Sequence, residues 1–304
     1  MTPVVVVALA ILAALWGSAF PLIKVGLEGL SAPHLTLLRH LVASLAFVPL
    51  LLAFRARLRP ARADVPYFFL LGMLGFFVYH LSLNYGEMRV SAGAASLIIA
   101  SAPAITALLA TFMVGDRMPR LAWIGSAVAF GGVALIVMGD RGAAAGPGLN
   151  AFAWLIVLSA VVTSFFAILQ RRMFARYRPI EVAAFATWAG TVPMLVFLPG
   201  LPADVADAGA RVLAATAYIG VFPSAIAYTL FAFALSRAPV TLVTTFLYLV
   251  PVFSLAASWL LIGEIPSSAT VVGGVVVIAG IVLVNVAKQR AAKRVATSTA
   301  LRGT

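Results

Sequence analysis

The sequence predicts an all-α membrane protein with ten transmembrane helices, built as two inverted repeats of five helices with both termini in the cytoplasm. Three observations lead to this prediction. Hydrophobic residues make up 63% of the 304 residues and charged residues only 10%, whereas about 25% of a soluble domain is charged. The apolar residues are gathered into long stretches, and the two halves of the chain share residues at a constant offset.

Each of ten apolar stretches is long enough to cross the bilayer, since about 20 residues of helix cross about 30 Å of hydrocarbon. The expected spans are residues 4–26, 33–54, 65–86, 91–114, 120–138, 149–173, 180–199, 211–234, 239–262 and 267–287. The breaks between them carry charges, proline or glycine. The first stretch has no positively charged start and continues beyond Ala8-Leu9-Ala10, so we expect a retained span rather than a cleaved signal peptide.

The positive charges indicate the orientation. If the N-terminus is cytoplasmic, the inner segments carry 16 Lys and Arg residues and the outer segments carry 4. This bias predicts cytoplasmic termini in a bacterial inner membrane. The formal net charge of +12 is then explained by topology and by contact with anionic headgroups, and no nucleic-acid partner is expected. Residues 288–304 are expected to form a basic, disordered cytoplasmic tail.

The chain repeats itself with an offset of 148 residues. The matched residues are Arg89, Pro103, Gly115, Gly125, Gly132 and Leu135, which recur as Arg237, Pro251, Gly263, Gly273, Gly280 and Leu283, while Asp116 is matched by Glu264. Residues 1–142 and 143–287 then form two five-helix repeats, and because five is odd the second is inverted. Inverted repeats are typical of alternating-access transporters with a substrate site between the halves, although a duplication kept only for folding leaves the same pattern.

The first span contains the sequence Leu-Trp-Gly-Ser-Ala-Phe at residues 15–20, and the fifth and tenth spans are rich in glycine. With the paired blocks that begin at Pro103 and Pro251, these features resemble the drug/metabolite transporter superfamily, in its EamA-type branch of ten-helix proteins. Overall likeness is greatest to the YddG-type exporters of aromatic amino acids. The resemblance implies alternating-access export of small metabolites, and specifically of aromatic or other apolar amino acids.

Helical periodicity combined with the repeat indicates where a substrate could bind. Phe76, His80 and Asn84 share one face of the third span, and the offset matches Phe76 and His80 to Ser224 and Tyr228 on the eighth. The candidate substrate-binding residues are Trp16, Phe76, Tyr79, His80, Asn84, Trp188, Ser224, Tyr228, Thr245 and Tyr248. The hydroxyls could instead bond their own backbone, and the tryptophans could simply fill gaps between helices.

Two prolines occupy equivalent positions in the fourth and ninth spans. Pro103 and Pro251 are expected to lie within helices and to kink them. Such paired kinks could act as hinges or could be fixed bends that shape a cavity.

The positions of the charged residues limit which classes of substrate are expected. All nine carboxylates are expected in loops or at span ends, which disfavours cationic substrates and predicts weak ion coupling or none, with His80 as the deep titratable candidate. Lys24 and Arg39 could meet a substrate carboxylate or could extend to the headgroups.

Other functions fit the sequence less well. An exchanger or importer of sugar phosphates or nucleotide sugars would need more cations in its cavity, and a channel or scramblase remains an alternative. An intramembrane enzyme would need a catalytic motif that the sequence lacks. No cofactor and no metal site are expected, and the partners are a small-molecule substrate and the bilayer. A stripe of small residues on the tenth span would suit a helix contact within a monomer or in a weak homodimer.

Overall fold

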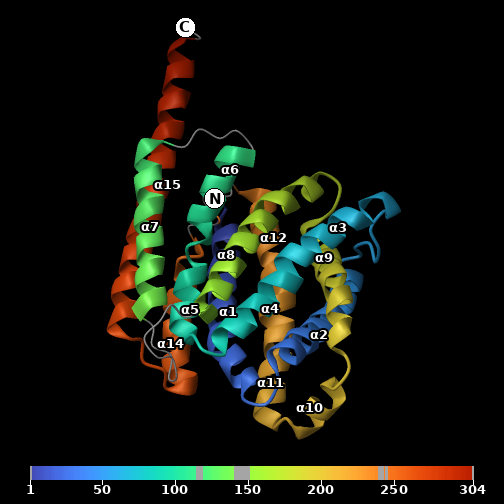
Figure 1. Ribbon diagram of the computed structural model, residues 1–304. Helices are drawn as coiled ribbons and strands as arrows, with labels where there is room; N and C mark the ends of the chain where they lie inside the picture. The colour runs from blue at the N-terminus through green and yellow to red at the C-terminus, as the bar shows by residue number, and fades with distance from the viewer. Residues whose placement is uncertain (1, 114–118, 140–150, 239–242, 244–245, 303–304) are drawn as a thin grey trace.

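The computed structural model describes residues 2–113, 119–139, 151–238, 243 and 246–302, and within these ranges the regular secondary structure is entirely helical. The helices form one bundle (Figure 1). Nine helices of the described ranges are long and apolar enough to cross a membrane. The remaining predicted span is represented by the shorter helix α14, because most of residues 239–245 lie outside the described ranges. The predicted all-α membrane fold is therefore confirmed.

The elements follow one another in two series. The first half contains α1 (Pro3–Leu27), α2 (Ala32–Ala53), η1 (Arg62–Asp64), α3 (Val65–Gly72), η2 (Met73–Val78), α4 (Tyr79–Glu87), α5 (Ala92–Ile99), α6 (Ala102–Met113) and α7 (Arg120–Gly139). The second half contains α8 (Ala151–Leu169), η3 (Gln170–Ala175), α9 (Pro179–Met194), η4 (Leu195–Phe197), α10 (Leu201–Asp207), α11 (Ala210–Ile219), η5 (Gly220–Ile226), α12 (Ala227–Arg237), α14 (Leu249–Ile262) and α15 (Ser268–Arg302).

The two halves share their irregularities as well as their helices. A wider π-helical turn, η2, interrupts the third span at residues 73–78, and η5 interrupts the eighth at residues 220–226. Adding the offset of 148 to 73–78 gives 221–226, so the two distortions are equivalent. Because π-helical turns are rare and often mark functional sites, their recurrence directs attention to the residues beside them.

The fourth span is broken rather than bent at its proline. It divides into α5 and α6, and Pro103 is the second residue of α6, while Pro251 is the third residue of α14. Both prolines thus lie in a first helical turn, where the missing N–H group has no intrahelical partner to lose. Both residues therefore lie within helices, as expected, but in the first turn rather than in the interior. At Pro103 a break between α5 and α6 replaces the expected kink.

The helices α7 and α15 lie side by side at one edge of the bundle (Figure 1). A Cβ atom on Gly125 would lie 2.6 Å from the carbonyl oxygen of Gly280, and one on Gly132 would lie 2.7 Å from that of Gly273. In the repeat, Gly125 is equivalent to Gly273 and Gly132 is equivalent to Gly280. The contact between Gly125 and Gly280 is therefore equivalent to the contact between Gly273 and Gly132, and the two repeats meet symmetrically here. The small residues of α15 therefore serve a close contact within the chain.

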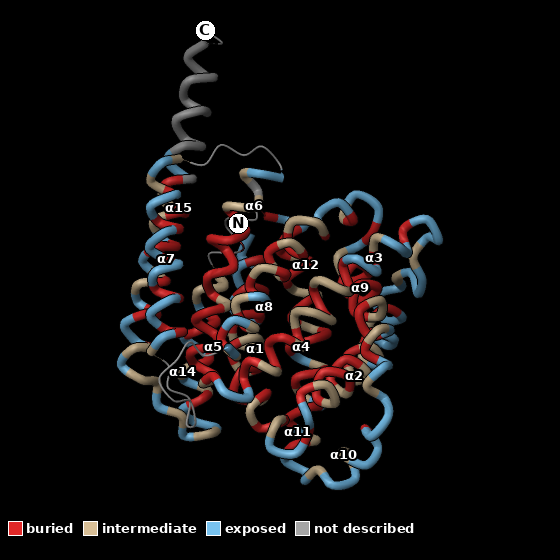
Figure 2. The backbone as a smooth tube through the Cα atoms, viewed as in Figure 1, coloured by how far each residue is buried: buried red, intermediate tan, exposed pale blue. Residues whose placement is uncertain are grey.

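Large apolar side chains are exposed on the outside of the bundle. Phe112 is 75% exposed, Trp259 63% and Val275 63%. Exposed positions recur along the outer sides of α7 and α15, whereas the helices inside the bundle are mostly buried (Figure 2). Such a surface is suited to lipid. We conclude that the protein crosses the membrane several times.

The basic tail is helical as far as Arg302, and its predicted disorder stays a prediction. Helix α15 continues beyond the membrane-spanning part to Arg302. Alanine, lysine, glutamine and arginine predominate in residues 287–294, and all four are good helix formers. Both termini lie at the same end of the bundle (Figure 1), as an even number of spans requires. Their placement in the cytoplasm stays a prediction.

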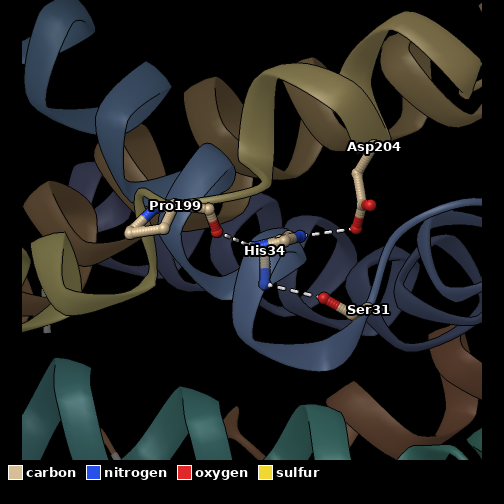
Figure 3. A network of polar contacts seen from close by, with 4 residues as sticks. All are labelled: Ser31, His34, Pro199 and Asp204. Carbon is tan, nitrogen blue, oxygen red and sulfur yellow. Dashed lines mark hydrogen bonds and ion pairs between the residues drawn. The ribbon is translucent and has the colours of Figure 1, made fainter.

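At the end of the bundle away from the termini, a polar network fastens α10 to the start of α2 (Figure 3). The Nδ1 atom of His34 lies 2.5 Å from a carboxylate oxygen of Asp204, and its Nε2 atom lies 3.1 Å from the carbonyl oxygen of Pro199. The backbone N–H of His34 donates to Ser31 Oγ. A single side chain thus fixes the α9–α11 connection against α2.

An equivalent network lies at the opposite end. The carboxylate of Glu181, at the start of α9, accepts hydrogen bonds of 2.8 Å from the backbone N–H groups of Arg57 and Arg178. The offset places residue 32, the start of α2, at residue 180 of α9. The start of α2 therefore holds the connection between α9 and α11, and the start of α9 holds the connection between α2 and α3. In each case the second span of one repeat binds the connection that precedes the third span of the other repeat.

Candidate substrate-binding site

A cavity lies between the two repeats. The first half lines it from α1, α2, α4, α5 and α6, and the second half from α8, η5, α12 and the start of α14, with Leu247 just before it. The side chains that decide its chemistry are Trp16, Arg39, Tyr79, His80, Tyr228 and Phe231. The cavity occupies the position that the inverted repeat indicates for a substrate site.

An aromatic cluster forms one side of the cavity. The ring centroid of Trp16 lies 5.3 Å from that of Tyr228 and 5.1 Å from that of Phe231. The Nε1–H group of Trp16 donates a 3.1 Å hydrogen bond to the carbonyl oxygen of Pro223 in η5. The indole ring is therefore held by a bond to the opposite repeat. These rings offer an apolar surface with fixed geometry to a flat or aliphatic ligand.

Arg39 brings a buried positive charge to the cavity. Its side chain is 2% exposed, and its Nη2 and Nε atoms donate to Ser224 Oγ at 3.0 Å and 3.3 Å. Its Nη1 atom is buried and has no hydrogen-bond partner among the described residues. The sequence left open whether Arg39 faces a substrate or extends to the headgroups. In the structure its side chain does not extend to the headgroups. A buried cation is costly. Glu87 is near enough to interact with the guanidinium electrostatically but makes no hydrogen bond to it, so a carboxylate in the cavity would stabilise it directly.

Two imidazole rings lie beside Arg39. His80 lines the cavity, and its ring centroid lies 4.5 Å from that of His40, with the planes at 67°. The Nδ1 atom of each ring faces the carbonyl oxygen one turn earlier in its own helix, Thr36 for His40 at 2.8 Å and Phe76 for His80 at 3.0 Å. Each ring is thereby fixed in orientation.

Of the predicted site residues, Trp16, Tyr79, His80 and Tyr228 line the cavity, as does Pro103. These residues come from four different spans. The structure therefore brings together the first, third, fourth and eighth spans at one place.

Three predicted residues support the cavity from behind. Phe76 is fully buried and its ring centroid lies 4.7 Å from that of Tyr228. Ser224 holds Arg39. Asn84 donates a 2.8 Å hydrogen bond from Nδ2 to Thr36 Oγ1 in α2.

The remaining predicted residues do not line the cavity. Trp188 donates from Nε1 to the carbonyl oxygen of Ser44 at 3.1 Å, so its ring packs between α9 and α2. The hydroxyl of Tyr248 accepts a 2.8 Å hydrogen bond from Asn285, and Pro251 is not among the lining residues. Thr245 lies outside the described residues.

The candidate substrate-binding residues did not include His40, and the sequence left open whether Arg39 meets a substrate or the headgroups. Subtracting the offset from Trp188, which was chosen for its place within a span, gives His40. Applying the repeat in this direction would have found the second imidazole and its neighbour Arg39. The basic residue could not be placed by periodicity alone, because a long side chain near a helix end can reach the headgroups.

Glu87 is an acid at a span end that the surrounding helices nevertheless bury. It lies at the last residue of α4, as expected of a span end, yet it is fully buried. Neither carboxylate oxygen has a hydrogen-bond partner among the described residues. Its charged neighbours are Lys24, Arg39 and Glu264. A second ionisable group therefore lies inside the bundle, beyond the cavity along α4.

Within the described ranges, no three His, Asp or Glu side chains converge in a way that would hold a metal ion. The side chains that face the cavity are suited to binding an organic molecule by ring contacts and by one cation. Together with the inverted helical repeat, this cavity defines a multi-pass membrane transporter of small molecules.

The particular family follows from comparison with known proteins. Residues 4–138 and residues 151–286 each match the EamA-like transporter family. The chain therefore belongs to this family. The two matches coincide with the two repeats that the sequence and the structure define.

Several bacterial transporters are similar over nearly the whole chain. "Uncharacterized transporter YdfC" of Bacillus subtilis is 39% identical over 88% of this chain and 86% of its own length. The "Probable terminal-alkyne amino-acid exporter" of Streptantibioticus cattleyicolor is 39% identical over 91% of this chain and 92% of its own. The "Probable amino-acid metabolite efflux pump" of Salmonella typhimurium is 26% identical over 88% and 89%.

A protein of known crystal structure shares the fold. It covers 93% of this chain and 96% of its own with a TM-score of 0.65, at 21% sequence identity. At that level of identity the likeness concerns the arrangement of helices alone.

Proposed function

We propose that this protein exports amino acids with aromatic or other apolar side chains across the cytoplasmic membrane of a bacterium. The observation that carries the proposal is the unpartnered Nη1 atom of Arg39 at an aromatic cavity. The guanidinium would bind the α-carboxylate of the substrate. The rings of Trp16, Tyr228 and Phe231 would pack against its side chain.

The names of the relatives support this substrate class. One is named as a probable exporter of terminal-alkyne amino acids and another as a probable amino-acid metabolite efflux pump. A terminal alkyne is small and apolar, so a cavity with one cation and mostly apolar walls would suit such an amino acid. The bacterial origin of these relatives agrees with a place in the cytoplasmic membrane.

Alternating access is the proposed mechanism. Two inverted repeats enclose the cavity, and each end of the bundle is held by a polar network between the repeats. We propose that the break between α5 and α6 at Pro103 and the start of α14 at Pro251 are hinges. Breaking one terminal network while the other persists would open the cavity to one side at a time.

Exchange of sugar phosphates ranks lower as a function. A phosphate monoester carries more negative charge than a carboxylate, and such sites usually gather several cations. Among the described residues that line the cavity, Arg39 alone carries a full charge. A single carboxylate matches this arrangement better.

The test is flux through the purified protein in liposomes. We expect saturable transport of L-phenylalanine and L-tryptophan. The same assay with a pH gradient tests whether transport is coupled to protons, for which His80 and Glu87 are the candidate residues. Removal of a charge-assisted hydrogen bond costs about 1.5–3 kcal/mol, so Arg39→Gln should lower kcat/KM about 10- to 100-fold. Arg211→Gln makes the same change at an exposed residue and should have little effect. Absence of saturable flux in folded wild-type protein would refute the proposed substrate class.

A further inference from the structure

The tautomer of His80 follows from its backbone contact. Its Nδ1 atom lies 3.0 Å from the carbonyl oxygen of Phe76. A carbonyl oxygen only accepts hydrogen bonds, so Nδ1 carries the hydrogen. In the neutral ring the other nitrogen, Nε2, then carries a lone pair and acts as an acceptor. Among the described residues, the hydrogen bond that this ring makes is the one at Nδ1.

His40 holds this arrangement in place. Its ring meets that of His80 edge to face at 4.5 Å and is itself bonded to the carbonyl oxygen of Thr36. Both side chains are fully buried or nearly so, with 0% of His40 and 1% of His80 exposed. The Nδ1 contact and the packing against His40 therefore leave the ring of His80 little freedom to rotate.

An acceptor thus lies close to a donor. His80 and Arg39 both line the cavity, and they are near enough to interact electrostatically. Arg39 presents an unpartnered N–H donor, and His80 presents a lone pair. An α-amino acid carries the complementary groups, a carboxylate and an ammonium, on one carbon atom. The pair of side chains is therefore complementary to a zwitterion rather than to a simple acid or a simple amine.

We propose that His80 Nε2 accepts a hydrogen bond from the α-ammonium of the substrate while Arg39 binds its carboxylate, so that the transporter selects free amino acids. This inference rests on the proposed function, since it names the groups by which the same cavity recognises an amino acid. A ligand without the ammonium leaves His80 without a donor, and a ligand without the carboxylate leaves Arg39 unpaired. Sites built to bind a polar group reject analogues that lack it.

The proposal is tested by competition. Uptake of labelled L-phenylalanine into liposomes is inhibited with unlabelled L-phenylalanine, with 3-phenylpropionate, which lacks the ammonium, and with 2-phenylethylamine, which lacks the carboxylate. We expect each analogue to inhibit at least about 10-fold more weakly than phenylalanine, which corresponds to about 1.4 kcal/mol. In His80→Phe the difference between phenylalanine and 3-phenylpropionate should disappear, while 2-phenylethylamine should stay weak.

His80→Gln provides the matched control, because its side-chain oxygen can accept a hydrogen bond near the position of Nε2. This variant should retain the preference for phenylalanine over 3-phenylpropionate. If His80→Phe is folded but too slow for flux, the same ratio is measured from the ligand-induced rise in unfolding temperature. An unchanged ratio in His80→Phe overturns the role of His80 while leaving amino-acid transport intact. No saturable phenylalanine uptake by the wild type refutes the proposed function itself.

Discussion

Arg39 and Ser224 join the two repeats at the wall of the cavity, with the Nη2 atom of Arg39 3.0 Å from the hydroxyl oxygen of Ser224. Arg39 lies in α2 and Ser224 in η5, the π-helical turn of the eighth span. The hydroxyl accepts from two nitrogens of the guanidinium and so leaves the third directed to other partners. The distorted turn thus contributes the group that orients the buried cation.

Ser224→Ala is predicted to weaken substrate binding. The change removes the hydroxyl that holds the guanidinium, and the loss of such a bond to a charged group costs about 1.5–3 kcal/mol. We expect KM to rise about 10-fold or more, with a smaller change in kcat because Arg39 itself remains. Ser236→Ala, at an exposed serine in α12, is the control. Equal KM values for the two variants would show that Ser224 does not position Arg39.

Trp16→Phe is predicted to loosen the aromatic cluster. Phenylalanine keeps an aromatic ring but cannot donate to the carbonyl oxygen of Pro223. A neutral hydrogen bond contributes about 0.5–1.5 kcal/mol, so we expect a lower unfolding temperature and a KM raised several-fold. The control is Trp259→Phe at an outward-facing tryptophan, which should leave transport unchanged. A normal KM in Trp16→Phe would argue against contact between this ring and the substrate.

Gly132→Ala is predicted to destabilise the contact between α7 and α15. The added Cβ atom would lie 2.6 Å from the backbone nitrogen of Val277 and 2.7 Å from the carbonyl oxygen of Gly273. Overpacking of this kind typically costs about 1–3 kcal/mol. Gly131→Ala, the neighbouring residue, meets nothing within 4 Å and should be neutral. Thermal unfolding in detergent compares the two variants, and similar unfolding temperatures would contradict the predicted close contact.

Asp204→Asn is predicted to change how stability depends on pH. The hydrogen bond from His34 lowers the pKa of Asp204 below its ordinary value, so the folded state favours the carboxylate. This stabilisation is complete above the unfolded pKa of about 3.9 and is lost as the pH falls through the lower folded value. The unfolding temperature of wild type should therefore fall in acid more than that of Asp204→Asn. Asp207→Asn, on the same helix, is the control and should keep the wild-type profile.

Much of the fold could be predicted because it depends on local properties of the chain. The length and apolarity of each stretch indicate the spans, and the offset of 148 residues indicates the inverted halves. The same reasoning reached the cavity at Trp16, Tyr79, His80 and Tyr228. It succeeded for His80 and Tyr228 because residues four apart share a helix face and because the repeat identifies the equivalent face in the other half.

The prediction failed where a side chain's surroundings depend on a distant helix. Trp188 packs between α9 and α2 because α2 supplies the carbonyl oxygen of Ser44, a partner that periodicity does not show. Pro103 begins a helix rather than bending one, and the sequence permits both. Glu87 lies at a span end as expected, but the surrounding helices bury it completely.

The sequence by itself determined that this chain is a helical membrane protein of two inverted repeats, because hydropathy and the repeat are properties of the order of residues. Only the tertiary structure decided that Arg39 is buried at the cavity, held by Ser224 from the other half and oriented beside His80. The physical reason is that the free energy of a buried charge depends on which groups surround it in space. Those groups come from helices far apart along the chain, Ser224 itself lying 185 residues from Arg39.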